Sequence, residues 1–102
     1  MSVLAALSIF PTNQPGTSLS PYVARVLNVI AASGLPHELG PMSTSIEGEW
    51  DEVMQVVTAC FRELEPDCDR VYMTMSIDYR ADRTDGLNRK VASVRAKQAS
   101  GK

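Results

Sequence analysis

Strand-like and helix-like segments follow one another in the order β-α-β-β-α-β along this chain, and few folds accommodate that order. Apolar residues recur at period two in the strands and at helical spacing in the helices. The expected strands cover Val3–Phe10, Pro36–Met42, Ser43–Gly48 and Val71–Tyr79, and the expected helices run from Ser20 to Gly34 and from Trp50 to Leu64. The order predicts an α+β, ferredoxin-like βαββαβ sandwich. Two helices would cover one face of a four-stranded antiparallel sheet, and a C-terminal helix would follow.

Local signals set the ends of the two main helices. We expect Ser20 to cap the first helix, with Pro21 in its first turn, where the missing N–H costs nothing. Gly34 and Pro36 end that helix. The apolar stripe of the second helix comprises Val53, Val57, Phe61 and Leu64, with Trp50 and Met54 beside it. Both helices therefore have one face to bury.

The length of 102 residues fits one domain. A chain of this size buries about 65% of its unfolded surface, which is enough for one core. We expect a single domain over residues 1–96, with a weak last helix marked by Leu87, Val91 and Val94. Residues 97–102 are polar and are expected to fray.

Composition excludes several classes of protein. Two cysteines are too few for a disulfide scaffold, and with one histidine they match no metal-site spacing. A formal net charge of −2 provides no global basic field for nucleic acid. No apolar run approaches the roughly 20 residues that span a bilayer. We expect a soluble cytoplasmic protein with reduced thiols, no cofactor, no metal, and neither nucleic acid nor membrane as a partner.

The sheet face turned away from the helices is the informative surface. Its expected residues are mostly small, hydroxyl-bearing or aromatic: Leu4, Ala6, Ser8, Phe10, Tyr72, Thr74, Ser76 and Asp78. If Ile46 points at the helices, Ser45 and Glu47 join this face. Such a mixture is unlike a solvated surface and predicts contact with another subunit or a ligand. A sheet face open to water is the alternative.

The available chemistry is limited. A cysteine–histidine nucleophile pair would need Cys60 or Cys68 beside His37, and Cys60 flanks the buried stripe of its helix. Glu47 ends a strand, so helix capping does not explain it, and we interpret it as a ligand contact. A surface carboxylate near a helix dipole is the alternative. RNA is disfavoured, because the open face carries Glu47 and Asp78 without lysine or arginine.

One segment carries a specific signature. The run from Met42 to Met54 reads Met-x-Thr-x-Ile-Glu-Gly-x-Trp-Asp-x-Val-Met. It resembles the thiamine-binding protein family, which consists of small ferredoxin-like proteins. Weaker similarity covers roughly residues 3–96 and includes Ser8–Pro11, Ser20–Val23, Arg70–Val71, Ile77–Arg80 and Lys90–Val94.

The resemblance implies a non-enzymatic binder of thiamine or its hydroxymethylpyrimidine part, assembled as a homodimer or homotetramer through open sheet faces. The expected ligand-contact residues are Ser8, Phe10, Thr44, Ser45, Glu47, Tyr72, Thr74 and Asp78. Carboxylates would offset the thiamine cation, hydroxyls would bond the pyrimidine edge, and aromatic rings would stack on it. Thr44 matches the signature, although alternation puts it on the helix side with Ile46.

Two other functions stay open from the sequence. An oligomeric structural or interaction module without a small-molecule ligand would use the same open face. A small enzyme, such as a ferredoxin-like monooxygenase or isomerase, would need an acid–base or nucleophile pair that the sequence does not assemble.

Overall fold

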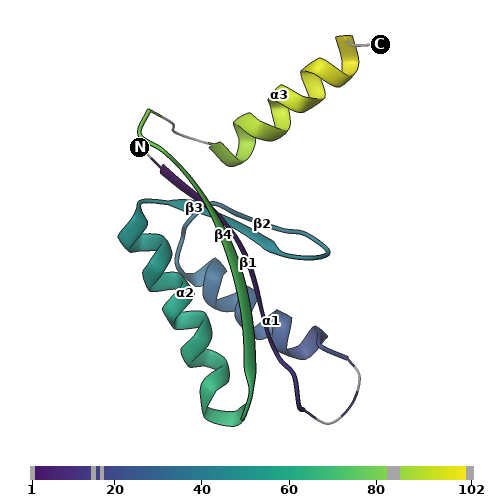
Figure 1. The fold of residues 1–102 in the computed structure, drawn as a ribbon, viewed down its shortest axis with the longest axis vertical. Helices are drawn as coiled ribbons and strands as arrows, with labels where there is room; N and C mark the ends of the chain where they lie inside the picture. Colours follow the sequence, from purple (N-terminus) through teal and green to yellow (C-terminus); the bar gives the residue numbers. More distant parts are fainter. Residues whose placement is uncertain (1, 15, 17, 83–85, 101–102) are drawn as a thin grey trace.

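The computed structural model describes residues 2–14, 16, 18–82 and 86–100 (Figure 1). Its elements in chain order are β1 (Ser2–Pro11), α1 (Ser20–Ala32), β2 (His37–Leu39), β3 (Thr44–Gly48), α2 (Trp50–Leu64), a 3₁₀ turn (Glu65–Asp67), β4 (Val71–Arg80) and α3 (Gly86–Ser100). The expected order is confirmed. The two short strands are shorter than expected, because the chain bends between Gly40 and Ser43.

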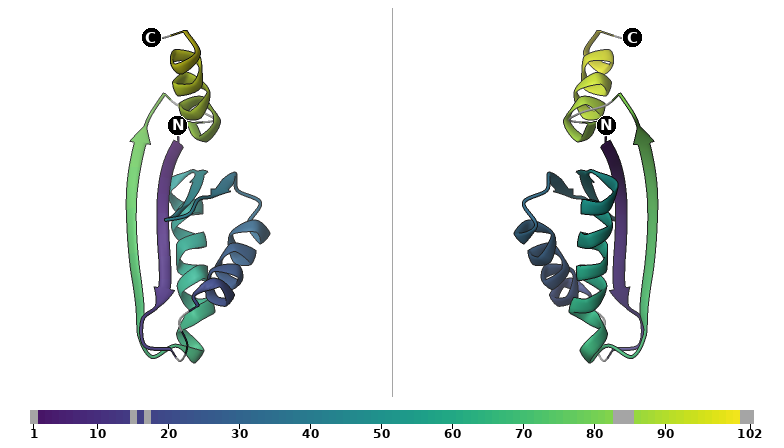
Figure 2. Two further views of the ribbon diagram at one scale, coloured as in Figure 1. Left: turned by 90° about the vertical axis from the view of Figure 1, so that its right-hand side faces the viewer. Right: turned by 90° about the vertical axis from the view of Figure 1, so that its left-hand side faces the viewer.

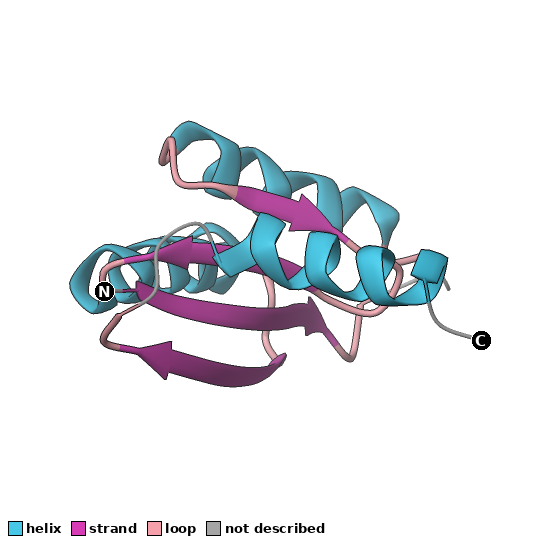
Figure 3. Cartoon of the chain, turned by 90° about the horizontal axis from the view of Figure 1, so that it is seen from above, coloured by secondary structure: helices cyan, strands magenta, loops and turns pink. Residues whose placement is uncertain are grey.

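The strands form one antiparallel sheet in the order β2-β3-β1-β4 (Figure 3). Helices α1 and α2 lie together on one side of β1 and β4, whereas α3 lies beyond the end of the sheet (Figure 2). This arrangement confirms the ferredoxin-like α+β sandwich. The central strand β1 is flanked by β3 and β4, so its residues lie at the middle of both sheet faces.

The core lies between the sheet and the two helices. The odd-numbered residues of β1 are buried, as period two requires: Val3, Ala5, Leu7 and Ile9. The same expectation is wrong for part of β4. With Tyr72, Thr74 and Ser76 on the outer face, alternation predicts that Met73 and Met75 face the helices, but the two methionines are 43% and 37% exposed. The reason is topological, because β4 is an edge strand and the helices do not reach across it.

Helix α1 does not begin as the sequence predicts, whereas helix α2 has a capping box. Ser20 does not cap α1: the cap position is Leu19, and the backbone N–H of Ser20 donates to Ser18 Oγ at 3.3 Å. In α2, the backbone N–H of Glu49 donates to Glu52 Oε1 at 3.0 Å. The Glu49 side chain accepts a hydrogen bond from the backbone N–H of Glu52, which completes a capping box. The acidic residues at the start of α2 are thereby explained as helix-start residues.

Arg25 joins α1 to the end of α2. Its guanidinium donates from Nη1 and Nη2 to the two carboxylate oxygens of Asp67, both at 2.9 Å. It also donates from Nε to Glu63 Oε2 at 3.0 Å and from Nη2 to the Glu63 carbonyl at 2.7 Å. Four hydrogen bonds from one planar group set the position of α1 against α2.

The last helix extends further than expected. Residues 97–100, for which the sequence predicts a polar tail, are helical within α3, and residues 101–102 lie outside the described part of the chain. Fraying of this tail and the single-domain boundary at residue 96 stay predictions. No described helix is long and apolar enough to cross a membrane.

Candidate functional site

Cross-strand partners define the sheet face turned away from the helices. Leu4 of β1 lies between Glu47 of β3 and Asp78 of β4. The next rows along this face are Ser45–Ala6–Ser76, Ser8–Thr74 and Phe10–Tyr72. Acidic residues therefore lie at one end, small residues in the middle and aromatic residues at the other end.

The acidic end of this face is less open than expected. Glu47 is only 4% exposed, so the expectation that it lies on an open surface is wrong. Helix α3 contacts β1 and β3 at the end of the sheet where β1 begins (Figure 1). The Leu4 row is near this end, so access to Glu47 from solvent is restricted.

The aromatic end is a paired contact. The rings of Phe10 and Tyr72 have centroids 5.7 Å apart and are tilted by 34°. Ring pairs at this separation are favourable when they are offset or tilted, because a direct face-to-face stack would bring their negative faces together. Tyr72 is 50% exposed, whereas Phe10 is half-buried and reaches a neighbouring pocket.

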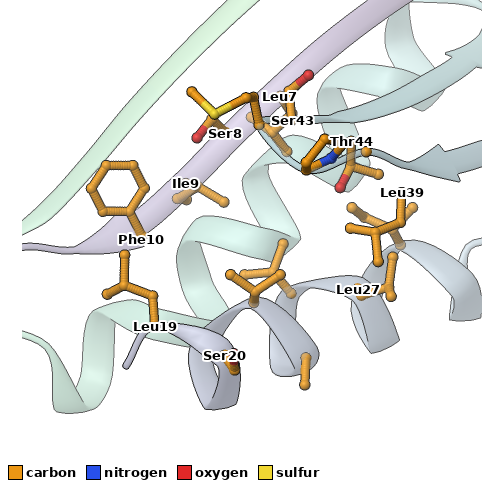
Figure 4. Close-up of a pocket in the computed structure, with 17 residues that line it drawn as sticks. Leu7, Ser8, Ile9, Phe10, Leu19, Ser20, Leu27, Leu39, Ser43 and Thr44 are labelled. Atoms are coloured by element: carbon orange, nitrogen blue, oxygen red, sulfur yellow. The ribbon is translucent and has the colours of Figure 1, made fainter. Parts of the chain in front are cut away.

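A pocket of about 670 Å³ opens beside β1 at Thr44, where β3 begins. The last β1–β3 partners are Leu7 and Thr44, so the remaining part of β1 has a strand neighbour only on its β4 side. Figure 4 shows Ile9 between Phe10 and Leu19 at one end and Leu39 and Thr44 at the other. Helix α1 and the β2–β3 turn supply the remaining walls.

The walls of this pocket are apolar, with hydroxyls placed among them. Four of the exposed large hydrophobic residues of the described chain belong to it: Leu19, Val23, Leu39 and Met42. The hydroxyl-bearing lining residues are Ser8, Ser20, Ser43 and Thr44. None of its lining residues is charged. Such a site suits a neutral heteroaromatic group better than an isolated ion, because burying an unpaired charge is costly.

The turn that forms one wall depends on a glycine. The backbone N–H of Gly40 donates to the Ser43 carbonyl at 2.9 Å. A side chain at Gly40 would bring its Cβ within 2.9 Å of the same carbonyl oxygen, closer than carbon and oxygen tolerate. Gly40 thus allows the tight turn that holds Leu39 and Ser43 at the pocket.

Only some of the eight residues expected to contact a ligand lie at the pocket. Ser8, Phe10 and Thr44 line the pocket, and Thr44 lies on the helix side as alternation predicts. Tyr72 and Thr74 are cross-strand partners of Phe10 and Ser8. The other three, Ser45, Glu47 and Asp78, lie further along the sheet. Ser8 lies four residues along β1 from Leu4, which corresponds to about 13 Å.

Sequence reasoning missed the helix and turn walls of the pocket. Helical spacing puts Val23 and Leu27 of α1 on the apolar stripe predicted to face the core, yet both line the pocket, and Val23 is 36% exposed. A usable signal was present in the unequal strands. The first strand is longer than the third, so an antiparallel pair must leave part of the first strand uncovered.

No nucleophile pair forms among the described residues. Cys60 is fully buried, and burial raises the pKa of its thiol to about 11, with a smaller contribution from the Glu63 carboxylate. His37 Nδ1 lies 2.9 Å from the Leu35 carbonyl, and neither Cys60 nor His37 lines the pocket. The described residues also contain no group of three or more side chains arranged to hold a metal ion.

Comparison with known proteins gives a consistent picture. The family described as thiamine-binding protein matches residues 5–95. A UPF0045 protein of Methanothermobacter thermautotrophicus is 38% identical over 97 residues, which cover 93% of this chain and 98% of that protein. A UPF0045 protein of Mycobacterium bovis is 37% identical and covers 92% of each chain.

Solved structures agree with the fold. A hypothetical protein of Methanocaldococcus jannaschii has a TM-score of 0.83 at 31% identity, covering 91% of this chain and 95% of its own. A Thermotoga maritima protein whose name refers to thiamine biosynthesis/salvage has a TM-score of 0.79 at 29% identity, covering 92% and 99%. Fold and sequence therefore point to the same group of proteins.

Proposed function

This chain belongs to the thiamine-binding protein family, and on this premise we propose that it is a non-enzymatic binding protein for thiamine or a related pyrimidine. The observation that carries the proposal is the apolar, hydroxyl-lined pocket beside Thr44, where β3 begins. Its volume of about 670 Å³ falls within the roughly 300–1,000 Å³ typical of small-molecule sites. A carrier, buffer or sensor would need only such a site.

The absence of charged lining residues supports binding of one part of thiamine rather than the other. Thiamine joins a neutral aminopyrimidine ring to a positively charged thiazolium ring. With no charged lining residue, the pocket favours the aminopyrimidine and leaves the thiazolium at the mouth. Phe10 would stack on the ring, and the hydroxyls of Ser8 and Thr44 would bond its edge.

We further propose that the protein assembles as a homodimer or homotetramer through the sheet face that carries Ala6. The middle of this face has small side chains, with Ser45 and Ser76 on either side of Ala6. Small side chains permit the close approach of a second sheet, and the exposed Tyr72 ring adds apolar area. In this assembly Ser45, Thr74 and Asp78 lie at the interface between the two sheets.

Calorimetric titration tests the proposal. Thiamine and 4-amino-5-hydroxymethyl-2-methylpyrimidine are expected to bind, whereas the isolated hydroxyethylthiazole is not. Ala24→Trp, which fills the pocket from the exposed surface of α1, should abolish the heat. The matched control is Ala59→Trp, an exposed position on α2 outside the pocket. Absence of heat from both pyrimidines at millimolar concentration, with an intact oligomer, would support the purely structural module instead.

A further inference from the structure

The main chain of Ile9 lies at the point where β1 loses its β3 neighbour. Ile9 is two residues beyond Leu7, the last residue of β1 that has a partner in β3. It also lines the pocket while being only 6% exposed. The direction of its N–H and carbonyl therefore decides what the pocket offers a ligand.

Hydrogen bonds at the end of the sheet fix this direction. The backbone N–H of Thr12 donates to the Arg70 carbonyl at 3.1 Å, so the polar groups of Thr12 face the β4 side. Main-chain groups alternate in direction along a strand. The even-numbered residues of β1 therefore bond to β4, and the odd-numbered residues face the β3 side. Pro11, which has no N–H, is on the odd-numbered side, where no ladder bond is lost.

Hydrogen bonds between β2 and β3 lead independently to the same direction for the main chain of Ile9. Gly40 N–H donates to the Ser43 carbonyl, and Glu47 N–H donates to the Pro36 carbonyl, both at 2.9 Å. The odd-numbered residues of β3 thus face β2, and Thr44 faces β1. Leu7 and Thr44 then form the last hydrogen-bonded pair, and the next outward-facing residue is Ile9.

The Ile9 N–H and carbonyl have no strand partner on the pocket side. Met42 would oppose Ile9 if β3 began two residues earlier, but Met42 lies in the bend and is 85% exposed. Within the described part of the chain, no hydrogen bond reaches Ile9 from this side. Buried main-chain groups are nearly always satisfied, so a donor and an acceptor side by side at a pocket mark a place for a ligand edge.

We propose that the main chain of Ile9 is the specificity-determining contact, and that it selects a heteroaromatic ring with an amino group next to a ring nitrogen. The Ile9 N–H donates to the ring nitrogen, and the amino group donates to the Ile9 carbonyl. The ligand thus replaces the missing residue of β3. This inference rests on the proposed function, because the aminopyrimidine of thiamine has such an edge.

Hydrogen exchange read by NMR tests the inference in the unmodified protein. Without ligand, the Ile9 amide should exchange at least tenfold faster than the amides of Leu7 and Phe10, which are bonded within the sheet. Saturating 4-amino-5-hydroxymethyl-2-methylpyrimidine should slow Ile9 to their level. Equal protection of the three amides in the free protein would overturn the inference.

A ligand series and a backbone change complete the test. The same pyrimidine without its amino group should bind roughly tenfold more weakly. An ester in place of the Ile9 amide should weaken binding similarly with little loss of stability, whereas an ester at Ala6 should lower stability and spare affinity. If the pyrimidine binds without affecting Ile9 in any of these readouts, this inference fails and the proposed function stands. If neither pyrimidine nor thiamine binds, the proposed function fails.

Discussion

Arg25 holds both carboxylate oxygens of Asp67 at 2.9 Å, and this pair joins the pocket wall α1 to the turn after α2. The same guanidinium donates to Glu63, so all three of its nitrogen atoms donate hydrogen bonds in one plane. Arg25→Lys keeps the charge but loses this geometry, and we expect the free energy of unfolding to fall by about 1 kcal/mol. Urea denaturation measures the change. Arg62→Lys is the control, because Arg62 makes a single ion pair with exposed Glu65 and lies over the neighbouring Phe61 ring without joining α1 to α2, and its effect should be smaller. Equal losses in the two variants would contradict a special role for Arg25.

Acid should weaken the same contact. The hydrogen bond from Arg25 holds the pKa of Asp67 below its ordinary value, so the carboxylate is the form that stabilises the fold. Its contribution is fully present above the ordinary carboxyl pKa, near pH 4, and is lost as the pH falls through the lower folded value. Thermal unfolding between pH 5 and pH 2 (roughly the window of carboxyl titration) should show this loss. Asp67→Asn and Arg25→Gln should each flatten the profile, and profiles parallel to the wild type would disprove the linkage.

The Cys60 thiol should not react with alkylating reagents in the folded protein. It is fully buried, and burial raises its pKa to about 11, so little thiolate exists at neutral pH. Iodoacetamide at pH 7.5 should leave Cys60 unmodified, and mass spectrometry of the digested protein measures this. Labelling in urea is the control that both thiols can react. Rapid modification of Cys60 without denaturant would mean that α2 opens locally.

Phe10 should matter to ligand binding more than its ring partner does. It lines the pocket and contacts Tyr72 at 5.7 Å between centroids. Phe10→Ala removes the stacking surface, so affinity for the pyrimidine should fall roughly tenfold. Tyr72→Phe keeps the supporting ring and should bind normally. Calorimetry on both variants measures the difference, and an unchanged Phe10→Ala affinity would exclude stacking on this residue.

Oligomer formation should depend on the small side chains of the outer sheet face. The wild-type mass in multi-angle light scattering should be two or four times the 11.1 kDa chain. Ala6→Arg places a long charged side chain between Ser45 and Ser76, and this variant should be monomeric. Gln55→Arg on the exposed surface of α2 is the charge-matched control. A monomeric wild type would reject the proposed assembly.

Most of the fold could be predicted because the signals are local. Alternation along β1 correctly indicated which residues are buried, and the helical spacing from Trp50 to Leu64 gave the bounds of α2. Such patterns depend on neighbours within a few residues. The exposure of Met73 and Met75 was not predictable in this way, because it depends on how far α1 and α2 extend across an edge strand.

The candidate site was predicted only in part. Ser8, Phe10 and Thr44 meet at the pocket. Glu47 and Asp78 lie in the Leu4 row of the sheet, about 13 Å along β1 from Ser8. Residue type identified chemistry suited to a ligand. Residue type alone could not tell which of these side chains share one cavity.

The sequence by itself determined the order of elements, the two faces of β1 and the family, since each follows from short-range periodicity or a contiguous motif. Tertiary structure decided where the pocket opens, because that depends on the strand register that makes Leu7 and Thr44 the last partners. It also decided that the main chain of Ile9 faces the pocket. The side-chain pattern of β1 does not encode this direction, because it depends on which residues of β1, β3 and β4 form the hydrogen-bonded pairs.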